Sequence, residues 1–202
     1  MIRRFLIVSL TLAILGAAAP ASANGFSDVR AALTAENEGR LDDALAFVNR
    51  AITQGALSNS ELATAYDVRG NVFDDKQDYV RAILDFDRAI KLSPNYAQAY
   101  NDRGIVRNDQ GNYDEAIADY NRAIKIAPKF AQAYNNRGLA YHRKANDVQA
   151  IADYTKAIEL DPKYAHAYYN RAISRHLRGE EANASKDYYE AIRLDAKLEK
   201  PH

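Results

Sequence analysis

The chain has 202 residues, of which 48% are hydrophobic, and 27 basic residues balance 27 acidic ones. At about 150 residues per domain, this length allows one domain or a short array of repeats, with enough apolar residues for a folded core. The balanced charge argues against a nucleic-acid-binding protein. The lack of cysteine excludes disulfides, thiolate metal sites and cysteine nucleophiles.

Residues 1–23 have the features of a secretory signal peptide. Arg3-Arg4 precedes an apolar stretch, residues 5–19, that is short for a transmembrane helix. Ala21-Ser22-Ala23 then supplies the small residues of a cleavage site. We expect cleavage before Asn24 and a mature protein in the periplasm or outside the cell, with no stable membrane insertion. Retention of this segment as a membrane anchor is the alternative.

Residues 24–62 are expected to form a degenerate helix pair that caps the N-terminal end. The segment from Phe26 to Glu38 predicts a first helix, and apolar residues at helical spacing between Leu41 and Ile52 predict a second. The segment from Gly55 to Leu62 carries four residues beyond the period of the units that follow.

From Ala63 to Leu198 the sequence repeats with a period of 34 residues. Residues 97–130 and 131–164 are identical at 17 of 34 positions. Such a period indicates a repeat architecture in which each unit packs on its neighbours. The four units are residues 63–96, 97–130, 131–164 and 165–198, and residues 199–202 form a tail.

Each unit predicts two helices. In residues 97–130, Tyr100, Gly104 and Arg107 recur at helical spacing, Gly111 interrupts the pattern, and Pro128 ends a second apolar stripe. The small residues at positions 8, 20 and 27 of the unit let the two helices approach closely, and the aromatic residues at positions 4 and 24 fill the remaining space.

This pattern resembles the tetratricopeptide repeat family. The motif residues are an aromatic at positions 4 and 24, Gly or Ala at 8, Ala at 20 and 27, and Pro at 32. The resemblance covers residues 63–198 and implies an all-α, right-handed solenoid of about five antiparallel helix pairs. The last unit departs from the pattern, because Ala172 replaces Gly and Ala196 replaces Pro. Its outer face is either polar enough to stand alone or meets a second chain, which leaves a homo-oligomer through the C-terminal end open.

Arginine and aspartate recur in all four units at unusual positions. The arginines occupy position 7, where the family usually has leucine, and the aspartates occupy position 23 on the facing helix. We expect structural Arg–Asp pairs within or between units, and independent exposed charges are the alternative. The residues are Arg69, Arg103, Arg137 and Arg171 with Asp85, Asp119, Asp153 and Asp187.

A concave groove lined by first helices is the binding surface that the resemblance implies. Amides there suit an extended peptide backbone, because each offers a donor and an acceptor. We expect these side chains to face outward, in a groove that binds a partner or, alternatively, is merely solvated. The candidate partner-binding residues are Asn101, Asp102, Gln132, Asn135, Asn136, His166, Tyr169 and Asn170, and Asp67, Asp74 and Asp75 form an acidic end.

Nothing in the sequence indicates catalysis. It contains no Gly-rich phosphate loop, no Gly-x-Ser-x-Gly and no His-Glu-x-x-His. We expect no enzyme activity, no cofactor and no metal, although His142 and His176 share position 12 and could approach a common metal.

The sequence thus favours a non-enzymatic scaffold or adaptor of the bacterial cell envelope that binds a protein or peptide. The alternatives are a self-associating structural module and a periplasmic protein that responds to a metal or a glycan.

Overall fold

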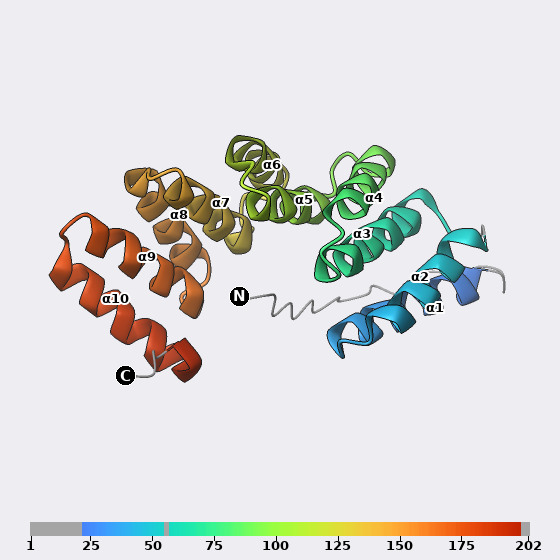
Figure 1. The fold of residues 1–202 in the computed structure, drawn as a ribbon, viewed down its shortest axis with the longest axis horizontal. Coiled ribbons are helices and arrows are strands. Elements are labelled where there is room, and N and C mark those ends of the chain that lie inside the picture. The colour runs from blue at the N-terminus through green and yellow to red at the C-terminus, as the bar shows by residue number, and fades with distance from the viewer. Residues whose placement is uncertain (1–21, 55–56, 199–202) are drawn as a thin grey trace.

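The computed structural model describes residues 22–54 and 57–198, and it forms ten α-helices over that part of the chain (Figure 1). Most of the predicted signal peptide, residues 1–21, lies outside the described residues. The helices are α1 (Ser22–Asn37), α2 (Leu41–Thr53), α3 (Asn59–Asp75), α4 (Tyr79–Leu92), α5 (Ala97–Asp109), α6 (Tyr113–Ile126), α7 (Ala131–Arg143), α8 (Asp147–Leu160), α9 (Ala165–Leu177) and α10 (Glu181–Leu194), followed by a short 3-10 turn, Ala196–Leu198.

Consecutive helices pair into five antiparallel hairpins that stack into an arch, with α1–α2 at one end and α9–α10 at the other (Figure 1). Each hairpin packs on the next mainly through its second helix and the following first helix. This arrangement confirms the all-α helix-pair solenoid. No helix in the described part of the chain has the length and apolar character needed to cross a membrane.

A glycine in the first helix lets an aromatic ring of the second lie directly on its backbone. A Cβ added at Gly104 would lie 2.6 Å from Cε1 of Tyr120. Gly70 with Phe86 and Gly138 with Tyr154 have the same arrangement, at 2.7 Å. All three rings are almost completely buried. The close approach is therefore what the glycine at position 8 provides.

The turn between the two helices of a hairpin needs one residue with left-handed backbone. Gly111 and Gly179 have φ of 81° and 75° there, and the equivalent Gln77 and Ala145 have φ of 61° and 56°. Glycine adopts this conformation without strain, whereas a residue with a Cβ does so at a cost.

The residues added before the first full repeat lengthen one helix. α3 begins at Asn59, and Ser58 caps it by accepting a hydrogen bond from the Glu61 backbone while the Glu61 carboxylate accepts one from the Ser58 backbone. The reciprocal bonds satisfy two amides that a helix start leaves free. As a result α3 has 17 residues, whereas α5, α7 and α9 have 13 each.

Candidate functional site

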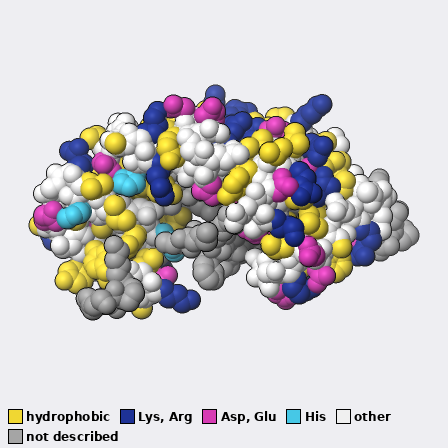
Figure 2. Space-filling model, in the orientation of Figure 1, with side chains coloured by type: hydrophobic (Ala, Val, Ile, Leu, Met, Phe, Trp, Pro, Cys, Tyr) yellow, Lys and Arg dark blue, Asp and Glu magenta, His cyan; other side chains and the backbone are white. Residues whose placement is uncertain are grey.

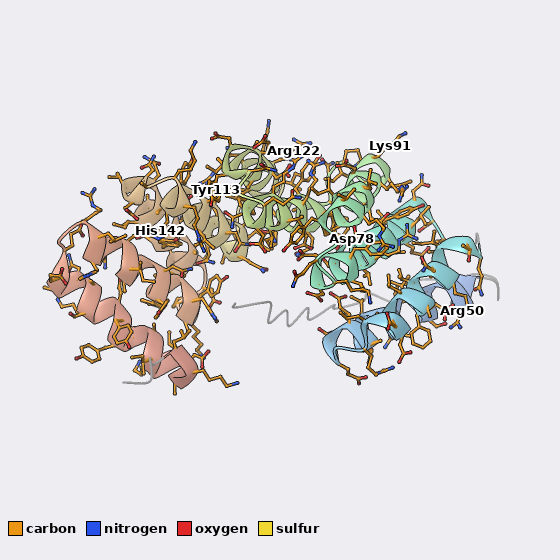
Figure 3. The ribbon with its side chains drawn as sticks, viewed as in Figure 1. Arg50, Asp78, Lys91, Tyr113, Arg122 and His142 are labelled. Atoms are coloured by element: carbon orange, nitrogen blue, oxygen red, sulfur yellow. The ribbon has the colours of Figure 1, made fainter. Side chains whose placement is uncertain are left out.

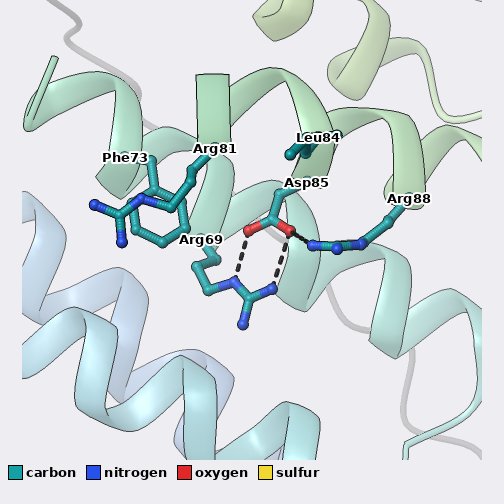
Figure 4. A pocket seen from close by; sticks show the side chains of 6 residues that line it. All are labelled: Arg69, Phe73, Arg81, Leu84, Asp85 and Arg88. Carbon is teal, nitrogen blue, oxygen red and sulfur yellow. Dashed lines mark hydrogen bonds and ion pairs between the residues drawn. The ribbon is translucent and has the colours of Figure 1, made fainter. Parts of the chain in front are cut away.

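Each recurring arginine forms a bidentate ion pair with the aspartate sixteen residues later on the second helix of its hairpin. In Arg137, Nε and Nη2 donate to the Asp153 carboxylate at 2.8 and 2.6 Å. Figure 4 shows the equivalent pair of Arg69 and Asp85, at 2.6 and 2.9 Å, with Arg88 as a further donor at 2.6 Å. The remaining pairs are Arg103–Asp119 and Arg171–Asp187.

The same arginines also connect neighbouring hairpins. Nη1 of Arg137 donates to Oδ1 of Asn121 on the preceding second helix at 2.6 Å, and Nη1 of Arg171 donates to Oγ1 of Thr155 at 3.0 Å. Arg103 bonds Asp87 and Arg69 bonds Asn49 in the same way. Each arginine therefore bonds both within and between units, and we call this set the Arg–Asp lattice.

Aromatic rings complete the lattice. Each of the four guanidinium groups lies 5.3–5.6 Å from the ring of the tyrosine three residues before it, within the range of a cation–π interaction. The hydrogen bond to Asp153 raises the pKa of Arg137 above its ordinary value, against the opposing effect of burial. With their donors engaged, these residues hold helices together.

The amides at the centre of the expected groove bond one another across hairpins. Nδ2 of Asn136 donates to Oδ1 of Asn101 at 3.0 Å, linking α7 to α5. Nδ2 of Asn170 donates to Oδ1 of Asn135 at 3.0 Å, linking α9 to α7. Asn101, Asn135 and Asp102 are buried, with Asn101 fully inaccessible. The expectation that these three side chains face outward is therefore wrong. Asn101 and Asn135 bond the next hairpin, and Asp102 accepts from residues of its own helix.

The acidic end is also buried in part. Asp67 and Asp74 on α3 are only 4% and 3% exposed, whereas Asp75 is half-buried. The Tyr96 hydroxyl donates to Asp67 at 3.1 Å. Burial and the nearby charge of Asp67 raise the pKa of Tyr96 well above its ordinary value. Asp67 and Asp74 are thus not the outward-facing carboxylates that the sequence predicted.

Five of the predicted groove residues stay half-exposed on first helices, namely Gln132, Asn136, His166, Tyr169 and Asn170. Gln132 and His166 begin α7 and α9, and Asn170 follows one turn after His166. Nε2 of the equivalent Gln98 donates to both oxygens of Asp102 at 3.0 Å. Of the predicted set, these five and Asp75 are those that retain solvent access.

The two histidines at position 12 each bond an acid of their own hairpin. Nδ1 of His142, which is labelled in Figure 3, lies 2.7 Å from Oδ1 of Asp147. Nδ1 of His176 lies 3.0 Å from Oε2 of Glu181. The described residues contain no group of three or more side chains suited to hold a metal ion.

Ser174 on α9 joins the first of these pairs. Its Oγ lies 3.3 Å from Nδ1 of His142, the same nitrogen that contacts Asp147. Burial raises the pKa of Asp147, but the hydrogen bonds from His142 and Ser174 outweigh it, so the pKa is lowered overall. In a nucleophile–base–acid triad the serine and the carboxylate contact opposite ring nitrogens. This cluster lacks that arrangement.

Tyr169 lies at the terminal end of the arch, where it lines a cavity of about 470 Å³ between α9 and α10. Its sequence position had predicted a partner-binding residue of the groove, and no sequence pattern predicted this cavity. Hydrophobic side chains with histidines beside them gather at this end (Figure 2). The cavity is lined by Tyr169, Ala172, Ile173, His176, Leu177, Glu181, Ala184, Ser185 and Tyr188. Leu177 is the residue that could have indicated an apolar end in the sequence. The equivalent residues of the other units, Asp75, Asp109 and Arg143, are charged.

Comparison with known protein families matches the repeat units. The profile described as "TPR repeat" matches residues 70–108 and 106–144, and two profiles described as "Tetratricopeptide repeat" match residues 131–164 and 153–193. No curated relative matches the sequence.

Solved structures of low sequence identity share the fold. MamA from Desulfovibrio magneticus RS-1 superposes with a TM-score of 0.70 at 21% identity, covering 88% of this chain and 98% of that chain. Pseudomonas aeruginosa PilF gives 0.78 at 18% identity, covering 90% and 79%. YrrB, described as a TPR protein with an unusual peptide-binding site, gives 0.62 at 23% identity, covering 85% and 87%.

Proposed function

Because the chain belongs to the tetratricopeptide repeat family, we propose that it is a non-enzymatic scaffold of the bacterial cell envelope that binds a peptide or protein partner. The proposal rests on the contrast between polar side chains that bond within the protein and polar side chains that stay accessible to solvent. The Arg–Asp lattice and the buried amides hold the first helices in place, while Gln132, His166 and Asn170 keep donors and acceptors available beside them. YrrB, with the same fold, is described by its peptide-binding site.

Half-exposed amides and an imidazole suit an extended peptide, whose backbone needs both donors and acceptors. Asp75 adds a negative charge near one end of this surface, which favours a partner with a basic segment there. The buried amides Asn101 and Asn135 contribute through the position of the helices and do not touch the partner.

The test of partner binding is affinity capture from envelope extract with the purified chain, followed by kinetics on the captured partner. Gln132→Ala and His166→Ala should each weaken binding by about 1–3 kcal/mol, as expected for a lost buried hydrogen bond or anchor. Asp75→Lys should mainly slow association with a basic partner. Lys91→Ala, on the outer side of α4, is the control (Figure 3). Loss of binding in outer-face variants alone would contradict the proposal.

The envelope location rests on the features of residues 1–23. Cleavage before Asn24 would remove the first two residues of α1, which begins at Ser22. Mass spectrometry of the protein from fractionated cells should therefore find Asn24 at the N-terminus in the soluble periplasmic fraction. An intact N-terminus in the membrane pellet would favour the anchor instead.

The metal- or glycan-responsive alternative has no supporting observation among the described residues, where no group of three or more side chains suited to hold a metal ion is found. The self-associating alternative is favoured by a separate observation at the C-terminal end, which leads to the next inference.

A further inference from the structure

The end of the arch formed by α9 and α10 differs in sequence from the same surface of every other repeat. We define this end face by Tyr169, Ile173, Leu177, Tyr188 and Tyr189. Ile173, Leu177 and Tyr189 are 39%, 62% and 72% exposed. A repeat that ends in solvent needs a polar outer face. This end face is apolar and exposed.

Position 25 of the repeat gives the clearest contrast. In the first three units it holds Asp87, Asn121 and Thr155, and each accepts a hydrogen bond from the lattice arginine of the next hairpin. In the last unit it holds Tyr189, which exposes a large ring. The residue is therefore suited to an apolar contact, whereas its equivalents accept hydrogen bonds from a following repeat.

Position 5 shows that this face corresponds to an interface elsewhere in the molecule. In the earlier units this position holds Asp67, Asn101 and Asn135, and all three are buried. Each accepts a hydrogen bond from a residue later in the chain, namely Tyr96, Asn136 and Asn170 in that order. Tyr169 holds it in the last unit and lines the terminal cavity. A polar interface residue has thus been replaced by a tyrosine at the one place where the described chain supplies no further hairpin.

Position 8 also differs in the last unit, where its residue, Ala172, lines the cavity. Ala172 occupies the place of the glycines on which Phe86, Tyr120 and Tyr154 lie buried. A Cβ at those glycines would lie within 2.7 Å of the ring. Tyr188 is half-buried and contacts Tyr169 and Tyr189, with ring centroids 6.2 and 6.3 Å apart.

We propose that this end face is a dimerisation surface and that its occupant is a second copy of this chain, with the two α10 helices antiparallel about a two-fold axis. The exposed side of α10 is complementary to itself in that arrangement. Its first half carries the small residues Ala182 and Ser185, and its second half carries Tyr189. An axis near Asp187 places Tyr189 of each copy over the small residues of the other.

Charge favours the same arrangement. Glu181 begins α10 and Arg193 lies in its last turn, and both are exposed, although Glu181 contacts His176 and Arg193 donates to Glu190 within the chain. Antiparallel packing brings the acidic start of one helix to the basic end of the other and opposes the two helix dipoles. A two-fold interface of this kind closes after two copies, so it gives a dimer and not a fibre.

The first experiment measures molar mass by light scattering over a series of protein concentrations. The protein is expressed from the full sequence and used with whatever N-terminal processing the host carries out. We expect a concentration-dependent rise to twice the chain mass. Leu177→Asp and Tyr189→Asp should each raise the dimer dissociation constant about tenfold to a hundredfold, the range for buried anchors of an interface. Val80→Asp on α4, where Val80 is 69% exposed, is the matched control and should leave it unchanged. A monomer at every concentration, or a dimer that both end-face variants leave intact, would overturn the proposal.

The second experiment tests the orientation on an intact end face. The chain has no cysteine, so single-cysteine variants report cleanly. In the antiparallel dimer, Ala182→Cys chains mixed with Arg193→Cys chains should form a disulfide, whereas neither variant alone should do so. The opposite pattern, with each variant cross-linking to itself, would overturn the antiparallel arrangement. The Gln132 and His166 variants leave this face unchanged, so failure of the dimer and failure of partner binding are separate results.

Discussion

The middle hairpins and the last hairpin follow one repeat yet differ at the positions that face the next unit. α5–α6 and α7–α8 present hydrogen-bond acceptors, Asn121 and Thr155, to a following arginine, and bury an aromatic ring on a glycine. α9–α10 presents Tyr189 and Leu177 and has Ala172 in place of the glycine. The Arg–Asp pair within the hairpin is nevertheless kept, since Arg171 and Asp187 pair as Arg137 and Asp153 do.

The repeated residues are of two kinds, those that act within one hairpin and those that contact the neighbouring hairpin. The arginine and aspartate that hold one hairpin together recur in every full unit, whereas the glycine under the ring is replaced by Ala172 in the last. Residues that face a neighbour change where the neighbour changes. In the last unit Tyr169, Leu177 and Tyr189 replace polar residues of the earlier units, whereas Ser185 replaces an isoleucine.

The largest effect is expected from breaking a lattice pair. Arg137 and Asp153 are 20% and 9% exposed, so Arg137→Ala leaves a nearly buried carboxylate and should lower the free energy of unfolding by about 3–5 kcal/mol. Arg171→Ala in the last hairpin should cost less, because Asp187 keeps a hydrogen bond from Nη1 of Arg175 at 2.7 Å. Chemical denaturation measures both.

Two controls sharpen that experiment. Replacing Arg137 and Asp153 together by leucine should cost far less than the single change. Arg193→Ala breaks an exposed pair with Glu190 and should leave the free energy of unfolding close to that of the wild type. An Arg137→Ala protein with wild-type stability would show that the lattice does not contribute.

A glycine substitution should distinguish the middle hairpins from the last. Gly104→Ala places a Cβ 2.6 Å from the Tyr120 ring and should cost about 1–3 kcal/mol through overpacking. The reverse change at the equivalent position, Ala172→Gly, should cost no more than the helix penalty of glycine, about 1 kcal/mol. Equal urea midpoints for the two variants would contradict the proposed packing difference.

The turns offer a smaller, stabilising effect. Ala145 has φ of 56° and Gly111 has φ of 81° in equivalent turns. Ala145→Gly should remove left-handed strain of about 1–2 kcal/mol and lose part of that gain to the entropy of glycine, for a net stabilisation of about 0.5–1 kcal/mol. Gly111→Ala should destabilise by a similar amount, since nothing lies within 4 Å of its added Cβ and only backbone strain acts. Thermal melting should show opposite shifts.

The smallest expected effect concerns the ion pair of the first hairpin. There the aspartate lies on the first helix and the arginine on the second, the opposite of the later hairpins. Asp28 lies on α1 and accepts from Arg50 on α2, and this hydrogen bond lowers the pKa of Asp28 despite burial. Because the folded pKa is below the unfolded value, the stabilisation is present above pH of about 4 and is lost as the pH falls through the folded pKa. The loss should not exceed about 1 kcal/mol. Arg50→Gln should remove this part of the pH dependence in acid unfolding, and an unchanged profile would contradict it.

Local features were predictable from the sequence. The 34-residue period, the helix pairs and the Arg–Asp partners at a spacing of sixteen all depend on contacts inside one hairpin, whose two helices are adjacent in sequence. The solenoid followed because one hairpin cannot bury its apolar face alone.

The surface of the stacked array was not predictable in the same way. Asp102 and Asn136 occupy the same position 6 of their units, yet Asp102 is fully buried and Asn136 half-exposed. Helical position cannot distinguish them, since the burial of each depends on how the next hairpin packs. Tyr169 was assigned to the groove for the same reason.

The sequence by itself determined the repeat, the helix pairs and the lattice partners, because these arise from residues within one unit. Only the tertiary structure decided which polar side chains remain accessible, that the groove amides bond one another across hairpins, and that the C-terminal end exposes an apolar face. Those properties depend on the distance and angle between neighbouring hairpins, and many side chains set that geometry together.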